Sequence, residues 1–105
     1  MTPASLGLDA EDMTTLLAIL QQYVPEAEVW AFGSRTQGTA RPFSDLDLVI
    51  VQDQPLDFKT RAELTYALSE SNLPMKTDLV EWARTSASFR DIILRDHLPL
   101  KAKAA

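Results

Sequence analysis

Two aspartates, Asp45 and Asp47, open the run DLDLVIV, whose other residues have the composition of a buried β-strand. Side chains two positions apart on a strand point to the same face, about 6–7 Å apart along it. Val49 and Val51 continue the face of the aspartates, while the leucines and the isoleucine form the other face. Two carboxylates this close repel each other, so in a partly buried place they need a cation or a proton.

A divalent metal would meet this need, because Mg²⁺ binds one or two carboxylates together with substrate phosphates and water. Phosphoryl-transfer sites hold two such ions about 3.5–4 Å apart. A third carboxylate usually comes from another strand, and Asp78 within KTDLVEW is the candidate. In the alternative interpretation, Asp45 only begins the strand and caps a turn with Ser44.

A glycine-containing turn precedes the aspartates. Gly33 and Ser34 follow the strand-like run EVWAF, and Arg35, Gly38 and Arg41 come next. Backbone N–H groups at a glycine turn can bind phosphate, and arginines can supply charge to triphosphate oxygens. A short helix beginning in SRTQGTA would direct its positive end to the same place. Simple turn formation is the alternative for the glycines.

Helices and strands alternate along the chain. Apolar spacing predicts helices over residues 9–24 and 58–71, and a last helix that begins after Ser86 or Ser88. Strands are expected over residues 28–32, 45–51 and 76–82. The expected order is therefore helix, strand, turn, strand, helix, strand, helix. We expect one domain over residues 1–105, with a core at about 9–100 and a disordered tail at 101–105.

The composition narrows the functional class. A chain of 105 residues with 46% hydrophobic residues is expected to form one globular domain. Its net charge of −5 disfavours long contacts with nucleic acid. No cysteine is present, which excludes disulfides and thiolate metal sites. We find neither a signal-peptide pattern nor an apolar run of membrane-spanning length, so we expect a cytoplasmic protein without membrane contact.

The stretch GSRTQGTARPFSDLDLVIV resembles the signature of the DNA polymerase beta-like nucleotidyltransferase superfamily. It has Gly-Ser, a short spacer, Gly, a longer spacer and then Ser-Asp-x-Asp-Leu. Size and element order are similar to the smallest branch, the minimal nucleotidyltransferases (MNT). The resemblance covers roughly residues 29–100, and the ending IILRDHLPL is similar to the family's last helix and strand. It implies an α+β fold, the polymerase beta-like palm, with a small mixed sheet flanked by helices.

The resemblance also implies a site and an activity. Gly33 and Ser34 would hold the outer phosphates of ATP, and Asp45 and Asp47 would ligate two Mg²⁺ ions. Asp78 would complete one metal site and help to activate the attacking hydroxyl. The chain would be a protein adenylyltransferase that moves AMP from ATP to a protein. It would be the antitoxin of a HEPN-domain RNase toxin, in a hetero-oligomer.

Two other functions stay open. An antitoxin could neutralise a HEPN toxin by binding alone, or the acceptor could be a small molecule. Nucleotidyl transfer depends on positioning and charge neutralisation and requires no covalent nucleophile, which agrees with a chain that lacks cysteine.

Several further residues have two interpretations. Trp30 and Trp82 could stack on adenine, although strand tryptophans more often pack in a core. Lys76 should share the face of Asp78 and could screen the carboxylates or contact a phosphate, or it could simply be a solvated lysine at the start of the strand. His97 comes after the last helix and is interpreted as a C-terminal-turn residue, favoured there by the helix dipole. Tyr66 is interpreted as a packing or partner-contact residue.

Overall fold

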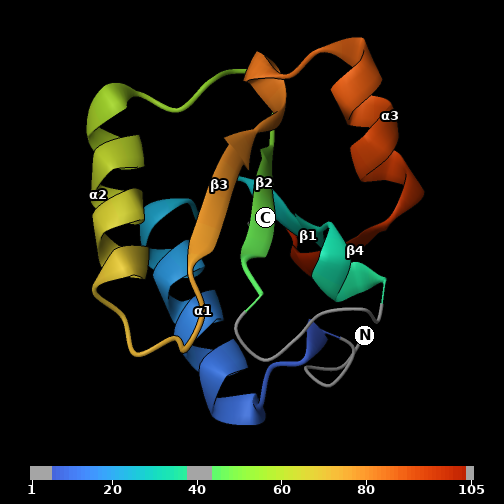
Figure 1. Cartoon of the computed structure of the whole chain (residues 1–105). Helices are drawn as coiled ribbons and strands as arrows, with labels where there is room; N and C mark the ends of the chain where they lie inside the picture. Colours follow the sequence, from blue (N-terminus) through green and yellow to red (C-terminus); the bar gives the residue numbers. More distant parts are fainter. Residues whose placement is uncertain (1–5, 38–43, 104–105) are drawn as a thin grey trace.

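The computed structural model describes residues 6–37 and 44–103 (Figure 1). In chain order its elements are α1 (Ala10–Tyr23), β1 (Glu28–Phe32), the 3₁₀ helix η2 (Ser34–Thr36), β2 (Leu46–Val51), α2 (Phe58–Ser69), β3 (Thr77–Glu81), the 3₁₀ helix η3 (Trp82–Arg84), α3 (Ala87–Arg95) and β4 (His97–Lys101). None of the helices in these described ranges is long and apolar enough to cross a membrane.

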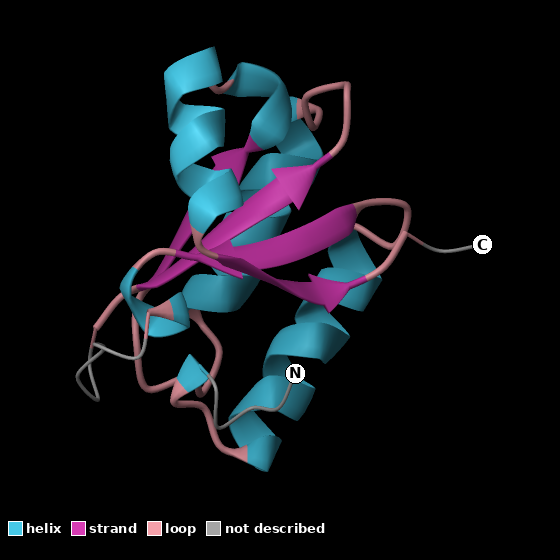
Figure 2. Ribbon diagram, turned by 90° about the vertical axis from the view of Figure 1, so that its right-hand side faces the viewer, coloured by secondary structure: helices cyan, strands magenta, loops and turns pink. Residues whose placement is uncertain are grey.

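The four strands form one mixed sheet in the order β3-β2-β1-β4. β1 pairs antiparallel with both β2 and β4, whereas β2 pairs parallel with β3. Helices cover both faces of this sheet (Figure 2). The predicted small mixed sheet flanked by helices is therefore confirmed.

The alternation predicted for β2 is also confirmed. Leu46, Leu48 and Ile50 are buried in the larger core, which α1 and α2 cover. Val49 and Val51 pack on the opposite face, in a smaller core that α3 covers. Both faces of β2 are thus covered by helices, and this fixes which way Asp47 points.

Side-chain caps begin all three α-helices. Asp9 accepts a hydrogen bond from the Asp12 amide at 2.7 Å, as expected from the sequence. Ser86 accepts one from the Phe89 amide at 3.2 Å, which selects Ser86 rather than Ser88 as the cap of α3. The helix predicted at 58–71 ends at Ser69, and the strands predicted at 45–51 and 76–82 are each shorter, at Leu46–Val51 and Thr77–Glu81.

The prediction of three strands from residue patterns is wrong, because His97–Lys101 forms a fourth strand at the edge beside β1. Pro99 weakens a strand pattern, yet an edge strand tolerates proline because one side of its backbone needs no partner. His97 is accordingly the first residue of a strand, although its Nδ1 lies 3.2 Å from the Leu94 carbonyl in the last turn of α3. Its ring lies on that of Trp30, with centroids 4.3 Å apart.

Lys101 is the last residue of β4, so it is part of the sheet and not of a disordered tail as predicted. Its ammonium group donates hydrogen bonds to the carbonyls of Pro25 and Ala27. These bonds tie the end of β4 to the loop that leads into β1. Burial lowers the pKa of Lys101.

Glu81, a buried carboxylate at the end of β3, anchors this edge strand to α2. It accepts hydrogen bonds from the Leu56 amide at 2.5 Å, from Arg61 at 2.7 Å and from Arg84 at 3.3 Å. Arg61 also donates to the Leu79 carbonyl at 2.9 Å. Burial by itself raises the pKa of Glu81, but these hydrogen bonds and the two arginine charges outweigh it and lower the pKa.

We predict that Glu81→Ala lowers the free energy of unfolding by roughly 1–3 kcal/mol, because it leaves the Leu56 amide and Arg61 without their buried acceptor. A lowered folded-state pKa means that the stabilisation by Glu81 is fully present above its ordinary value of 4.5 and is lost as the pH falls through the folded-state pKa. The difference between variant and wild type should therefore shrink in acid. Urea unfolding at several pH values measures both effects.

Glu63→Ala is the matched control, since this half-exposed carboxylate lies 3.9 Å from the exposed Lys59 ammonium. Its effect should stay within about 0.5 kcal/mol. Equal losses in the two variants would contradict the anchoring role of Glu81.

Candidate nucleotide and metal site

Sheet pairing brings two of the three predicted aspartates together. Asp47 on β2 is the register partner of Asp78 on β3. The strands are parallel neighbours, about 4.8 Å apart, so both side chains point to the same face of the sheet. Asp78 therefore lies next to Asp47, as the sequence interpretation requires.

The electrostatics of Asp47 reflect this crowding. Partial burial raises its pKa, and the nearby charges of Asp78 and Asp45 raise it further. The exposed ammonium of Lys76 lies 3.9 Å from Asp78 Oδ1. This placement agrees with a solvated lysine at the start of the strand that lies close to Asp78, and contact with a phosphate stays a prediction.

Because residue 33 is a glycine, the backbone of the turn can lie directly against the Asp47 side chain. The Gly33 backbone has φ 84° and ψ −153°, a region that essentially only glycine occupies. A Cβ atom at this position would lie 2.4 Å from Asp47 Oδ2. The Gly-Ser turn and the carboxylates are thus parts of one site. Ser34 begins η2, so the predicted short helix is a single 3₁₀ turn.

Arg35 does not face this site, contrary to the prediction that it binds triphosphate oxygens. Its side chain is only 2% exposed. The guanidinium donates to the Leu6 carbonyl at 2.9 Å and, through Nε and Nη2, to the Ser44 carbonyl at 3.0 and 2.9 Å. The other two residues predicted to bind nucleotide, Gly38 and Arg41, lie outside the described residues.

Whether the aspartates suit a metal follows from their chemistry. In the two described segments, no group of three or more histidine or acidic side chains is arranged to hold a metal ion by itself. Asp47 and Asp78 nevertheless form a pair of carboxylates, with the exposed Asp45 near enough to raise the pKa of Asp47. One or two carboxylates are what Mg²⁺ takes from a protein when nucleotide phosphates and water complete its shell. The residues fit a metal that arrives with a nucleotide.

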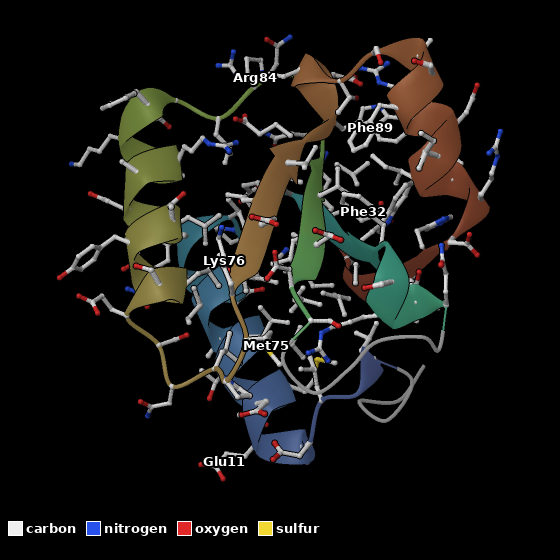
Figure 3. The ribbon with its side chains drawn as sticks, viewed as in Figure 1. Glu11, Phe32, Met75, Lys76, Arg84 and Phe89 are labelled. Atoms are coloured by element: carbon white, nitrogen blue, oxygen red, sulfur yellow. The ribbon has the colours of Figure 1, made fainter. Side chains whose placement is uncertain are left out.

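The aromatic side chains of the same sheet face pack among themselves. The Trp30 and Trp82 rings meet edge to face, with centroids 5.8 Å apart, and Arg90 lies 4.8 Å from the centre of the Trp82 ring. Phe32 and Phe89 point toward each other between the sheet and α3 (Figure 3). The core role considered for the two tryptophans is the one that the structure shows.

Sequence inspection missed the contacts that hold the Gly-Ser turn from the other side. The Thr36 hydroxyl donates to the Gly33 carbonyl at 2.7 Å and to the Asp96 carbonyl at 3.1 Å. Gln37 donates to the Asp96 carboxylate at 3.3 Å. Because Asp96 is about 60 residues away along the chain, no local pattern could have indicated it.

A cavity of about 500 Å³ lies elsewhere, between the start of α2 and the end of β3. Its lining includes Phe58, Arg61, Glu81 and Arg84 but none of the three aspartates. We therefore locate the candidate site by the carboxylates and the glycine turn, and not by the size of a cavity.

Comparison with known proteins finds a matching family and a similar relative. The family described as Polymerase beta, Nucleotidyltransferase matches residues 14–103. A Haemophilus influenzae protein named "Probable protein adenylyltransferase MntA" is 47% identical over 100 residues, which are 95% of this chain and 88% of the relative.

Two solved structures are similar in fold. A toxin–antitoxin complex with AMP-PNP contains a chain that is 26% identical, with a TM-score of 0.72 over 87% of this chain and 73% of the other. A structure described as a candidate minimal nucleotidyltransferase is 31% identical, with a TM-score of 0.64 over 84% of this chain and 95% of the other.

We predict that Asp47→Asn raises the melting temperature in metal-free buffer at neutral pH. The raised folded-state pKa of Asp47 means that stability falls as the pH rises from its ordinary value of 3.8 through that pKa, and the amide removes this loss. Mg²⁺ with a nonhydrolysable ATP analogue should then stabilise the wild type, by about 2.7 kcal/mol at 100 times Kd. The variant should show little of this gain. A thermal-shift assay measures both effects, and an equal gain in the variant would refute the assignment of Asp47.

We predict that Gly33→Ala costs roughly 1–3 kcal/mol of stability, because alanine is strained at this φ and its Cβ would displace the Asp47 carboxylate. The thermal gain on adding Mg²⁺ and the ATP analogue should be lost as well. Ile93→Val is the control for stability loss alone, since it should cost about 0.5–1.5 kcal/mol in the core beside α3. If both variants kept the ligand response, the close approach of Gly33 to Asp47 would have no part in nucleotide binding.

Proposed function

Because the chain belongs to the polymerase beta nucleotidyltransferase family, we propose that it transfers AMP from ATP to a hydroxyl group of a partner protein, a HEPN-domain toxin. The observation that carries this proposal is the placement of Asp47 and Asp78 in register on one sheet face, against the Gly33 turn. The relative named as an adenylyltransferase supports the reaction. The similar toxin–antitoxin complex with AMP-PNP supports the nucleotide and the kind of partner.

The proposed chemistry assigns a task to each residue of the site. Asp45 and Asp47 would ligate two Mg²⁺ ions, and Asp78 would share one of them. When bound, the metal ions neutralise phosphate charge and polarise the α-phosphate. Gly33 and Ser34 would hold the outer phosphates through backbone N–H groups and the serine hydroxyl.

The bond changes balance in this scheme. The acceptor oxygen attacks the α-phosphorus, the bond from that phosphorus to the bridging oxygen breaks, and pyrophosphate leaves with its electron pair. The proton of the acceptor hydroxyl would pass to Asp78, whose side chain is half-exposed. Because the reaction consumes ATP, we propose that it takes place in the cytoplasm.

Neutralisation by binding alone is a second candidate, favoured by apolar side chains on the outer surface. On α2, Phe58 is 89% exposed and Tyr66 is 67% exposed. Such side chains suit contact with a protein partner whether or not a nucleotide is transferred.

We predict that the wild-type protein, Mg²⁺ and labelled ATP transfer label to the co-expressed HEPN partner, and that Asp47→Asn loses more than the roughly 10–100-fold that removing an outer-shell group costs. Asp53→Asn is the matched control, because this exposed aspartate follows the far end of β2 and should keep wild-type transfer. Equal transfer by wild type and Asp47→Asn would refute the proposal.

Toxicity in cells separates catalysis from binding. The double variant Asp45→Asn plus Asp47→Asn should form the complex yet fail to protect against the toxin. Full protection by this variant would instead establish neutralisation by binding alone.

A further inference from the structure

We propose that Arg35 is a positioning residue that sets Asp45 relative to the Gly33 turn, and that it does not contact the nucleotide. This inference rests on the proposed function for its catalytic consequence, but the geometry behind it is independent of that function. A single buried guanidinium connects the turn, the N-terminal segment and the chain that enters β2.

Asp45 is held between two fixed points. On one side, the Ser44 carbonyl accepts two hydrogen bonds from Arg35, which fixes the peptide plane leading into Asp45. On the other side, the Leu46 amide donates to the Lys76 carbonyl at 2.8 Å, which starts the pairing of β2 with β3. The position of this exposed carboxylate therefore depends on a bond from Arg35 and a bond from the strand of Asp78.

Arg35 is itself placed by the turn that it supports. It lies in η2, two residues after Gly33, whose α-carbon faces Asp47. Thr36 and Gln37 of the same turn bond to Asp96 at the end of α3. Because these contacts hold η2 in place, the hydrogen bonds from the Arg35 guanidinium also fix Ser44 relative to η2.

The third partner of Arg35 is the N-terminal segment before α1. The Leu6 carbonyl accepts from Nη1, while the Leu6 side chain is buried in the larger core. Gly7 follows with φ 73°, and a Cβ there would lie 3.1 Å from Nη1. The segment packs closely against the guanidinium. A side chain at position 7 would therefore displace the Arg35 guanidinium while residue 35 itself stays an arginine.

Donor geometry, not charge, is what these contacts need. Three nitrogens of one planar guanidinium donate to the two carbonyl oxygens of Ser44 and Leu6, and a lysine ammonium cannot reproduce that geometry. A phosphate ligand would behave in the opposite way, because lysine keeps the positive charge. Arg35→Lys therefore distinguishes a positioning role from direct phosphate contact.

The test compares Arg35→Lys with the wild type in transfer of labelled AMP to the partner, at a temperature where circular dichroism shows both to be folded. We expect kcat to fall about tenfold or more, while KM for ATP changes less than about threefold. The reason is that Arg35 positions Asp45 and does not itself contact ATP. Wild-type kcat, or a loss confined to KM, would overturn the proposal. Arg95→Lys, at the exposed end of α3, is the matched control and should match wild type.

A second measurement does not depend on transfer. In amide NMR spectra of the wild type, titration with Mg²⁺ alone should shift the signals of Asp45 and Asp47, and in Arg35→Lys the Asp45 response should be reduced. An unchanged Asp45 response would overturn the positioning role even if the wild type transferred no AMP to any partner. Absence of transfer by the wild type would instead refute the proposed function.

Gly7→Ala keeps the proposal testable if Arg35→Lys does not fold. It should lower kcat in the same direction, with KM for ATP unchanged. The losses of Gly7→Ala and Arg35→Lys should be less than additive in the double variant, because both act through one guanidinium. Fully additive losses would overturn the coupling through Leu6.

Discussion

The parallel pairing of β2 with β3 places two like charges side by side, and the candidate site depends on that constraint. The strand register places Asp47 beside Asp78. Because Asp47 is partly buried, water does not fully screen the repulsion between the two carboxylates. The cores on both faces of β2 hold the strand in this register. A slip by one residue would turn the aspartates into the larger core and expose its leucines. The hydrophobic cores therefore stabilise an arrangement that the carboxylates alone would oppose.

The Gly-Ser turn is adapted to the same pair of charges. Gly33 allows the backbone to approach Asp47 where any side chain would collide with the carboxylate. Its neighbours hold the turn through contacts that reach distant parts of the chain: Arg35 to Leu6 and Thr36 to Asp96. A turn fixed from two sides keeps its amide groups oriented before any ligand arrives, and such preorganisation is what electrostatic catalysis requires.

Much of this arrangement follows from local patterns, and the exceptions have a common cause. Alternation along β2 predicted both of its faces, and acids and serines at helix starts predicted the caps at Asp9 and Ser86. The position of Asp78 was predicted from the need for a third carboxylate. The buried roles of Arg35 and Glu81 could not be predicted, because each depends on backbone groups 9 to 29 residues away. Tertiary structure also decided the fourth strand, in which an edge position overrides the effect of Pro99.

The distribution of positive charge completes the physical picture of the site. Four of the five arginines in the described residues donate to groups of the protein itself: Arg35, Arg61, Arg84 and Arg90. Near the aspartates, the exposed Lys76 ammonium lies 3.9 Å from Asp78. A triphosphate bound against Gly33 would add negative charge to a face that already carries three carboxylates. Within the described part of the chain, the side chains thus offer far less positive charge than a bound nucleotide would require. Divalent cations entering with the nucleotide would restore the balance, and they would relieve the same repulsion that raises the pKa of Asp47.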